Sequence, residues 1–187
     1  MSTTGYRGWA AAGGVAGPVA FAAAWWLVGR RKPGYSPVSQ PVSRLAAHRS
    51  PTRAAMTVGF AGYAAGVGGL ALALARSDRR VAAGLAANAA SMVAVASLPL
   101  DAPYGDGPHV VAATVAYVSL AATPLVAAGA GKGRTSRADV AVGAATGALL
   151  VLSQAVPARR GLFQRLGLSL GHLWIARRAL RETARAG

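Results

Sequence analysis

Long apolar runs separated by short polar breaks make up most of this sequence. A helix needs about 20 mostly apolar residues to cross the roughly 30 Å hydrocarbon core of a membrane. Five runs meet this length clearly, at residues 9–29, 54–75, 81–98, 110–131 and 140–156, and a sixth at 161–180 is interrupted by Arg165 and His172. The buried face of a bundle helix can carry such residues. The pattern therefore predicts an all-α, polytopic transmembrane helical bundle with six spans, or with five if the last segment is only interfacial.

The predicted spans form a single integral-membrane domain over residues 1–187, with one long connection, the extended loop at residues 30–53. The first half of this loop is rich in Pro, Gly and Ser, which favours turns. The second half, at residues 39–48, predicts a short helix lying on the membrane with Ser43 as its N-cap. The loop is either a solvated linker or a lid that folds over the mouth of the bundle and takes part in function.

The composition supports a membrane protein and argues against one that binds nucleic acid. Only 13% of the residues are charged, against about 25% in soluble domains. The net charge is +15, but the basic residues form short groups between apolar runs, as in membrane loops that face anionic head groups. The expected partners are membrane lipids, with a small-molecule or lipid ligand as a further option and the oligomeric state left open. The chain has no Cys, which excludes disulfides, Cys-ligated zinc and thiol catalysis, and no cofactor is expected.

The distribution of Lys and Arg between the loops predicts the orientation. With six spans, both termini share one side with the loops around residues 76–80 and 132–137. That side carries 11 Lys and Arg residues and the opposite side carries 8. Because cytoplasmic loops carry an excess of Lys and Arg, we expect a multi-pass protein of the cell (plasma) membrane with both termini in the cytoplasm. The loop at 30–53 and the turn at 97–111 then face outward.

Small residues recur at a spacing of four, which predicts close packing of the helices. Lipid supplies no hydrophobic drive for helices to associate, so close backbone approach at Gly replaces it. We interpret these positions as packing faces within one chain rather than as a dimerisation signal. Asn88 and Ser91, in the middle of the third run, are expected to form interhelical hydrogen bonds. The glycine pairs are Gly13 and Gly17, Gly62 and Gly66, and Gly143 and Gly147.

The break between the third and fourth spans holds the candidate chemistry. Asp101 ends one apolar run and His109 begins the next, so a tight connection would bring both to one depth on adjacent helices. An Asp beside a His favours the charged imidazole and fixes the orientation of its ring. Such a pair could act as orienter and general base, supply two metal ligands or only tie two helix ends together. Asp106 is interpreted as turn chemistry.

Arg165 lies about one turn inside the outer end of the last run, where it would either pair with Asp101 or extend to the interface. Asp101, His109 and Arg165 therefore form the candidate outward-facing polar cluster. His172 is the further candidate for a metal site with Asp101 and His109. It lies about 16 Å deep in its span at 1.5 Å per residue, whereas His109 lies at the surface, so no metal is expected. Catalytic residues are left unassigned.

Several short motifs spread along the chain resemble one family. They are Gly34-Tyr35-Ser36-Pro37, Ser39-Gln40-Pro41-Val42-Ser43, Leu98-Pro99-Leu100-Asp101 with His109 eight residues later, Gly161-Leu162-Phe163-Gln164-Arg165, and Trp174. Together they resemble an uncharacterised family of small bacterial and archaeal membrane proteins, domain of unknown function 998 (DUF998). The resemblance implies six spans and no particular activity. It also implies an acidic residue after Ser43, where this chain has Arg44. The candidate motif residues of the outer loop are Gly34, Tyr35, Ser36, Pro37, Ser39 and Ser43.

Three classes of function remain open at this stage. The favoured one is a non-catalytic integral membrane protein whose polar cluster binds a lipid head group or an envelope partner. The second is an intramembrane lipid hydrolase, which in one form would depend on a metal. The third is a small proton-coupled transporter, which would require a polar path from Asp101 through His172 toward Asn88.

Overall fold

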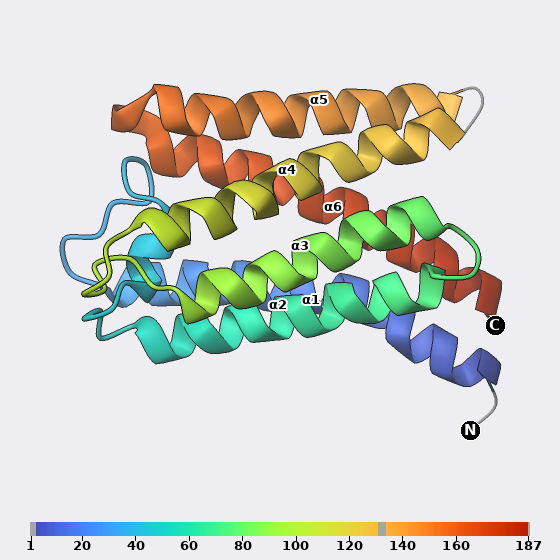
Figure 1. The fold of residues 1–187 in the computed structure, drawn as a ribbon, viewed down its shortest axis with the longest axis horizontal. Helices are drawn as coiled ribbons and strands as arrows, with labels where there is room; N and C mark the ends of the chain where they lie inside the picture. Colours follow the sequence, from blue (N-terminus) through green and yellow to red (C-terminus); the bar gives the residue numbers. More distant parts are fainter. Residues whose placement is uncertain (1–2, 131–133, 187) are drawn as a thin grey trace.

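A computed structural model describes residues 3–130 and 134–186 (Figure 1). Two short 3₁₀ helices, η1 (Val42–Ala46) and η2 (Pro157–Arg159), accompany the long helices. The described residues contain no strand, so the all-α helical bundle is confirmed. The long helices are α1 (Thr3–Arg31), α2 (Arg53–Leu74), α3 (Arg79–Ser97), α4 (Gly107–Ala130), α5 (Arg134–Ala155) and α6 (Arg160–Ala186).

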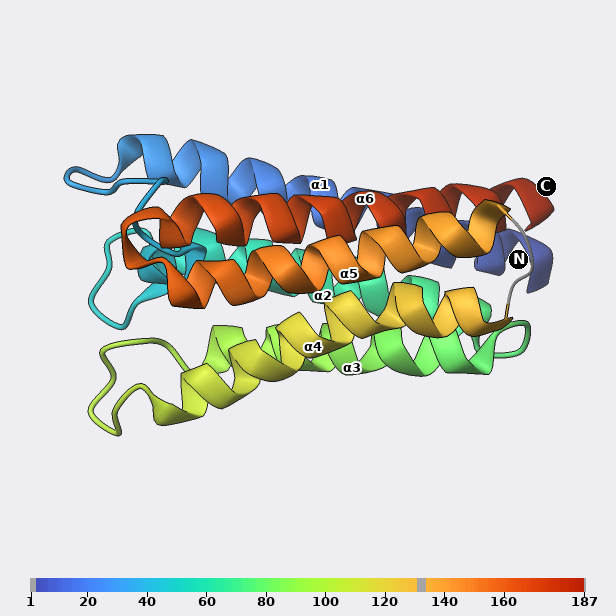
Figure 2. The ribbon, with the colours of Figure 1, turned by 90° about the horizontal axis from the view of Figure 1, so that it is seen from above.

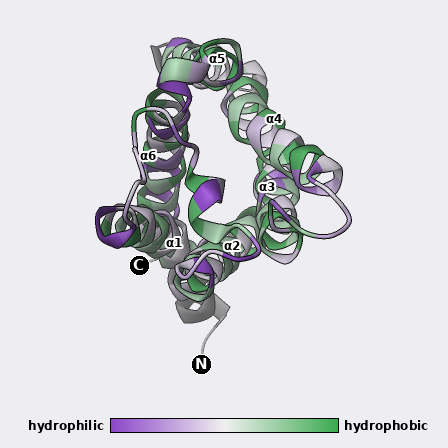
Figure 3. Ribbon diagram, turned by 90° about the vertical axis from the view of Figure 1, so that its left-hand side faces the viewer, coloured by the Kyte–Doolittle hydropathy of each residue, from purple (hydrophilic) through white to green (hydrophobic). Residues whose placement is uncertain are grey.

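The six long helices form a closed ring in chain order. Each helix packs against the next one, and α6 closes the ring by packing against α1. Figure 3 looks onto the ring from the end that holds the 32–52, 98–106 and 156–159 connections, here called the loop end. Figures 1 and 2 show the two ends of the chain at the opposite end, here called the terminal end. An even number of lengthwise helices places both ends of the chain on one side.

Five of the helices in the described part, α1 to α5, are long and apolar enough to cross a membrane. Helix α6 is not among them, yet it runs lengthwise between α1 and α5 (Figure 2). A helix that runs lengthwise between two helices long and apolar enough to span a membrane crosses the same layer as they do. The polar residues that interrupt its apolar run, Gln164, Arg165 and His172, are buried inside the bundle. The structure therefore supports the six-helix arrangement rather than a last segment lying across the surface.

Glycines bring the backbones of α1 and α2 into contact. A Cβ atom on Gly13 would lie 2.9 Å from the carbonyl oxygen of Gly66, and one on Gly17 would lie 3.1 Å from that of Gly62. Gly143 likewise faces the α4 backbone, where its Cβ would lie 2.8 Å from the carbonyl oxygen of Ala121. These approaches confirm Gly13, Gly17, Gly66 and Gly143 as packing positions within one chain, whereas a Cβ on Gly62 would meet nothing within 4 Å.

One buried hydrogen-bond network joins the middle of α2, α3 and α4. The hydroxyl of Tyr63 donates to Oδ1 of Asn88 at 2.8 Å, and the Asn88 amide donates to the carbonyl oxygen of Ala116 at 2.8 Å. Asn88 therefore makes the interhelical bonds that its position predicts. The prediction for Ser91 is wrong, because its hydroxyl donates to Ala87 one turn back in the same helix.

Candidate functional site

The 32–52 connection folds into the mouth of the ring instead of forming a free linker. Helix η1 packs against α1, α2 and α6, and its side chains of Val42 and Leu45 are buried. Figure 3 shows this short helical turn inside the ring. The predicted surface helix is therefore wrong in type and place, because its apolar residues point into the bundle. Its N-cap position is held by Pro41 and not by Ser43.

The start of α6 fastens this connection through backbone contacts. The N–H of Leu162 donates to the carbonyl oxygen of Val38 at 2.9 Å. Gly161 makes the approach feasible, since a Cβ there would overlap the carbonyl oxygen of Gln40. The amide oxygen of Gln164 accepts the N–H of Val42 at 2.7 Å. The motif at residues 161–165 is thus the surface of α6 on which the 32–52 connection packs.

Arg165, on the face of α6 next to α1, binds the same connection through its side chain. Its Nη1 donates to the carbonyl oxygens of Pro37 at 2.7 Å and Gln40 at 3.1 Å, and its Nη2 donates to the hydroxyl of Tyr35. The Tyr35 hydroxyl in turn lies 3.1 Å from the carbonyl oxygen of Pro41, to which it donates. The two terminal nitrogens of Arg165 therefore bond to oxygens of the loop, and Arg165 makes no hydrogen bond or ion pair with Asp101.

The remaining outer-loop motif residues shape the turn itself. Gly34 has φ +69°, a left-handed conformation that Gly adopts at little cost. The hydroxyl of Ser36 accepts the N–H of Ser39 at 3.4 Å, and the N–H of Ser36 donates to the side-chain oxygen of Gln40. Ser43 lies deeper and lines the internal cavity described below.

Asp101 pairs with Arg44, the residue at the position where the family resemblance implies an acidic side chain. Nη1 of Arg44 lies 2.8 Å from each carboxylate oxygen of Asp101. Asp101 itself has φ 59°, and its N–H donates to Oδ1 of Asp106 at 2.7 Å. Asp106 thus acts in the turn, as predicted. The ion pair links η1 to the α3–α4 connection.

His109 is buried at the start of α4 and contacts the end of α3. Its Nδ1 lies 2.7 Å from the carbonyl oxygen of Leu98. A carbonyl only accepts, so Nδ1 carries a proton, while Nε2 makes no hydrogen bond with the described residues. No hydrogen bond or ion pair in the described part of the chain joins His109, Asp101 and Arg165 to one another. The three residues of the predicted polar cluster therefore lie in three separate contacts.

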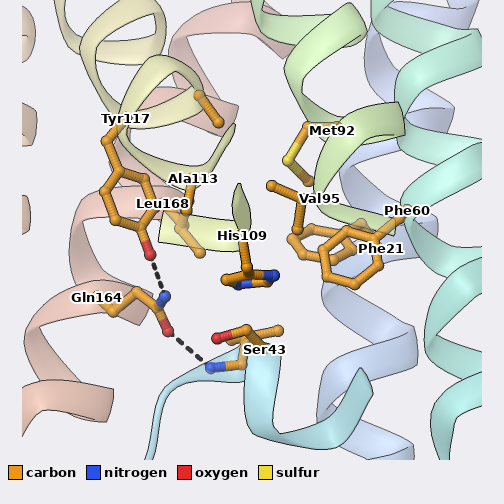
Figure 4. A pocket seen from close by; sticks show the side chains of 12 residues that line it. Phe21, Ser43, Phe60, Met92, Val95, His109, Ala113, Tyr117, Gln164 and Leu168 are labelled. Carbon is orange, nitrogen blue, oxygen red and sulfur yellow. Dashed lines mark hydrogen bonds between the residues drawn. The ribbon is translucent and has the colours of Figure 1, made fainter. Parts of the chain in front are cut away.

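A small internal cavity lies beneath η1, with a volume of about 30 Å³ (Figure 4). That volume holds about one or two water molecules. His109 and Ser43 line it, and Gln164 bridges the Val42 N–H and the hydroxyl of Tyr117 across one wall. Apolar side chains form most of the remaining wall. The cavity is thus apolar on one side and polar on the other.

A larger groove of about 440 Å³ opens between α4, α5 and the start of α6. Ligand sites commonly measure about 300–1,000 Å³. Its rim includes exposed Val110, Val118 and Val151, and its loop end includes His109 and Arg160. The Nε atom of Arg160 is buried without a hydrogen-bond partner among the described residues. Five residues line both this groove and the internal cavity, namely Ser43, His109, Ala113, Tyr117 and Gln164.

Sequence reasoning does not single out three of the groove residues as site residues. Arg160 looks like an ordinary loop charge, Tyr117 like an interior aromatic residue, and Gln164 is only one letter of a motif. Arg160 and Gln164 stand four residues apart on one helix, which places them on the same face and is the one signal that could have found them. His109 is the predicted cluster residue that lines the groove.

His172 lies away from these contacts, between aromatic rings. Its ring centroid is 4.8 Å from that of Tyr63 and 5.9 Å from that of Phe21. Among the described residues, no three His, Asp or Glu side chains are grouped so that they could hold one metal ion. No hydrogen bond of the described residues extends from Asp101 toward His172 either.

The loop end is strongly basic. Burial raises the pKa of the Tyr35 hydroxyl, and the neighbouring Arg165 guanidinium opposes this shift. Burial, followed by repulsion from Arg44, lowers the pKa of Lys32, and Asp101 opposes that shift. The segments at this end contain two acidic residues, Asp101 and Asp106. They contain nine basic residues, namely Arg30, Arg31, Lys32, Arg44, Arg49, Arg53, Arg159, Arg160 and Arg165.

A ring of lengthwise apolar helices, closed at one end by its longest connection, defines an α-helical integral membrane protein. The family profile described as "Protein of unknown function (DUF998)" matches residues 15–181. The chain belongs to this family, as its motifs predict. No curated protein and no solved structure matches the chain significantly.

Proposed function

We propose that this chain is a non-catalytic, multi-pass protein of the plasma membrane that holds a lipid with an anionic head in the groove between α4, α5 and α6. The observation that supports the proposal is the groove itself. One opening of about 440 Å³ passes from exposed apolar side chains to an arginine at the loop end that has no partner among the described residues. The apolar part of the groove matches the acyl chain of such a lipid, and the arginine matches its charged head.

The apolar part of the groove suits an acyl chain. Val118 and Val151 are 61% and 66% exposed on neighbouring helices, where a membrane protein faces lipid. A groove that opens between two such helices admits a chain sideways from the bilayer. The ligand then never has to leave the hydrocarbon layer, which favours a lipid over a water-soluble molecule.

The polar part of the groove suits an anionic head with hydroxyl groups. Arg160 has no hydrogen bond or ion pair with any described residue, and its Nε is buried. The free Nε2 of His109 and the hydroxyl of Tyr117, which accepts from Gln164, add further polar contacts. Charge-assisted bonds from arginine to phosphate are about twice as strong as neutral ones. The head would therefore be held mainly by Arg160.

The orientation belongs to the same proposal. The segments of the terminal end contain 11 Lys and Arg residues and the connections of the loop end contain 8, which favours cytoplasmic termini. The polar end of the groove then lies at the outer leaflet.

The orientation is tested by labelling intact cells with a membrane-impermeant thiol reagent. Two single-Cys variants are compared, one with Cys in place of Arg49 and one with Cys in place of Arg76. We expect labelling at residue 49 only, and labelling at residue 76 alone would reverse the orientation.

The lipid proposal is tested by photo-crosslinking in nanodiscs that contain phosphatidylglycerol with a photoreactive acyl chain. We expect crosslinks in α4 and α5 beside the groove. Val118→Trp fills the groove and should lower the yield several-fold, whereas Val115→Trp, on the same helix but outside the groove, should not. Arg160→Gln should weaken binding about tenfold, while the exposed neighbour Arg159→Gln leaves it unchanged. Equal yields in Val118→Trp and Val115→Trp would refute the proposal.

A further inference from the structure

A second pocket lies on the other side of the loop connection, between the end of α1 and Arg165 of α6. It has a volume of about 370 Å³ and shares no lining residue with the groove between α4, α5 and α6. Its polar walls carry indole, guanidinium, ammonium and phenol groups. The side chains that matter here are Trp25, Trp26, Arg30, Lys32, Tyr35 and Arg165.

Two buried N–H groups beside this pocket have no acceptor among the described residues. They are Nε1 of Trp25 and Nε of Arg165. Arg165 is only 8% exposed, and its guanidinium carbon lies 5.1 Å from the centre of the Trp25 ring. A buried donor without an acceptor is unfavourable and calls for an explanation. Both side chains line the pocket, so an acceptor bound there would lie close to these N–H groups.

None of the cations of the pocket forms an ion pair with a carboxylate of the described residues. Arg30 stacks over the Trp26 ring at 4.5 Å and makes no hydrogen bond or ion pair with the described residues. Lys32 donates to the carbonyl oxygen of Arg44 at 2.7 Å and the hydroxyl of Ser50 at 2.9 Å, both of which are neutral. Arg165 likewise meets only carbonyl and hydroxyl oxygens. Three positive charges therefore surround one opening, and no carboxylate of the described chain contacts them.

We infer that this pocket binds a phosphate group, carried by a lipid head or free in solution. Phosphate presents oxygens in several directions, so it can accept from donors on different walls at once, whereas a carboxylate offers two oxygens in one plane. The guanidinium edge of Arg and the indole N–H are both suited to such oxygens. Trp25 and Trp26 stand at the end of α1, where aromatic residues mark the head-group region of a membrane.

The variants for the test spare the loop contacts of Arg165. Trp25→Phe keeps an aromatic ring beside Arg165 but removes the indole N–H that has no acceptor. Without phosphate, its unfolding temperature should equal or exceed that of the wild type, because a buried unsatisfied donor is gone. Arg30→Gln removes one cation. The matched controls are Arg31→Gln, whose side chain is exposed beside Arg30, and Trp9→Phe, whose ring is 76% exposed near the terminal end.

The experiment measures the unfolding temperature in two arms. In the first, potassium phosphate is titrated into protein in non-ionic detergent, against potassium chloride of equal ionic strength. In the second, nanodiscs of a phosphate-free glycolipid are compared with nanodiscs that also contain phosphatidic acid. Ligand that binds only the folded state raises the unfolding temperature. Phosphate salts also stabilise folded proteins in general, and that effect acts on all variants alike. A rise in the first arm that Trp25→Phe and Arg30→Gln reduce therefore identifies free phosphate as sufficient. Such a rise in the second arm alone identifies the lipid head as the source.

We expect Trp25→Phe and Arg30→Gln each to weaken the response about tenfold, and both control variants to retain it. The groove variants Arg160→Gln and Val118→Trp should also retain it, so the phosphate pocket and the lipid groove are tested separately. No rise in either arm would overturn the inference. So would a rise of wild-type size in Trp25→Phe or Arg30→Gln.

Discussion

Arg44 and Asp101, 57 residues apart in the chain, form the ion pair that ties helix η1 in the mouth of the ring to the α3–α4 connection. Nη1 of Arg44 lies 2.8 Å from both carboxylate oxygens. The two side chains are 44% and 51% exposed. Solvent screens such a pair, so its value lies in positioning η1 more than in stability.

We therefore expect Arg44→Ala and Asp101→Asn each to lower the free energy of unfolding by about 1 kcal/mol or less. Asn removes the charge of residue 101 and tolerates its left-handed backbone. Thermal unfolding in detergent at low and high salt measures this, and the difference should shrink as salt rises. A loss of several kcal/mol that salt leaves unchanged would contradict a screened surface pair.

The α1–α2 contact can be tested with two glycines of the same helix, α2, one as the variant and one as its control. A Cβ on Gly66 would overlap the carbonyl oxygen of Gly13, whereas a Cβ on Gly62 meets nothing within 4 Å. Gly66→Ala should thus cost about 1–3 kcal/mol by overpacking. Gly62→Ala should be neutral or stabilising, because Ala favours a helix over Gly.

Resistance to thermal unfolding in one detergent compares the two glycine variants directly. A Gly66→Ala protein as stable as Gly62→Ala would mean that the backbones of α1 and α2 do not touch at this crossing. Gly13→Ala should behave like Gly66→Ala, since its Cβ would lie 2.9 Å from the Gly66 carbonyl oxygen.

The helices are predictable from the sequence because apolar length is itself the property that places a helix in lipid. Much less of the loop end is predictable. His109 bonds to a backbone carbonyl of Leu98, and carbonyl positions leave no trace in a residue pattern. Arg165 meets Tyr35, 130 residues away, so no local spacing signals the contact. The expected pairing of Asp101 with His109 rests on nearness in the chain. The 32–52 connection folds into the mouth of the ring and brings Arg44 to Asp101 instead.

Arg165 should control how firmly the 32–52 connection is held. Its guanidinium donates to Pro37, Gln40 and Tyr35 at once, which a lysine ammonium cannot reproduce with the same planar geometry. Arg165→Lys should therefore speed hydrogen exchange in residues 35–42 about tenfold or more, with little change in α2 and α3.

Arg159→Lys is the matched control for Arg165→Lys. Arg159 is exposed, and its side chain makes no hydrogen bond to the described residues, so the same substitution there removes no contact with the loop. Its exchange rates in residues 35–42 should equal those of the wild type. Equal exchange rates in the Arg165→Lys and Arg159→Lys proteins would show that Arg165 does not fasten the loop.

Tyr35 gives the structure a pH dependence at alkaline pH. Burial raises the pKa of its hydroxyl above the usual value near 10, and Arg165 only partly opposes this. A raised pKa in the folded state means that the neutral phenol is favoured by folding. Its contribution to stability is therefore fully present below about pH 10 and is lost as the pH rises through the raised pKa.

The difference between the phenolate absorbance curves of wild-type protein and Tyr35→Phe isolates this one group. We expect its midpoint to lie above that of a free tyrosine amide under the same conditions. Unfolding temperatures should fall with pH more steeply in the wild type than in Tyr35→Phe over the same alkaline range. If the Tyr35 midpoint lies at or below that of the free amide, the hydroxyl is not held in the buried contact with Arg165 and the Pro41 carbonyl, and the loop is open in solution.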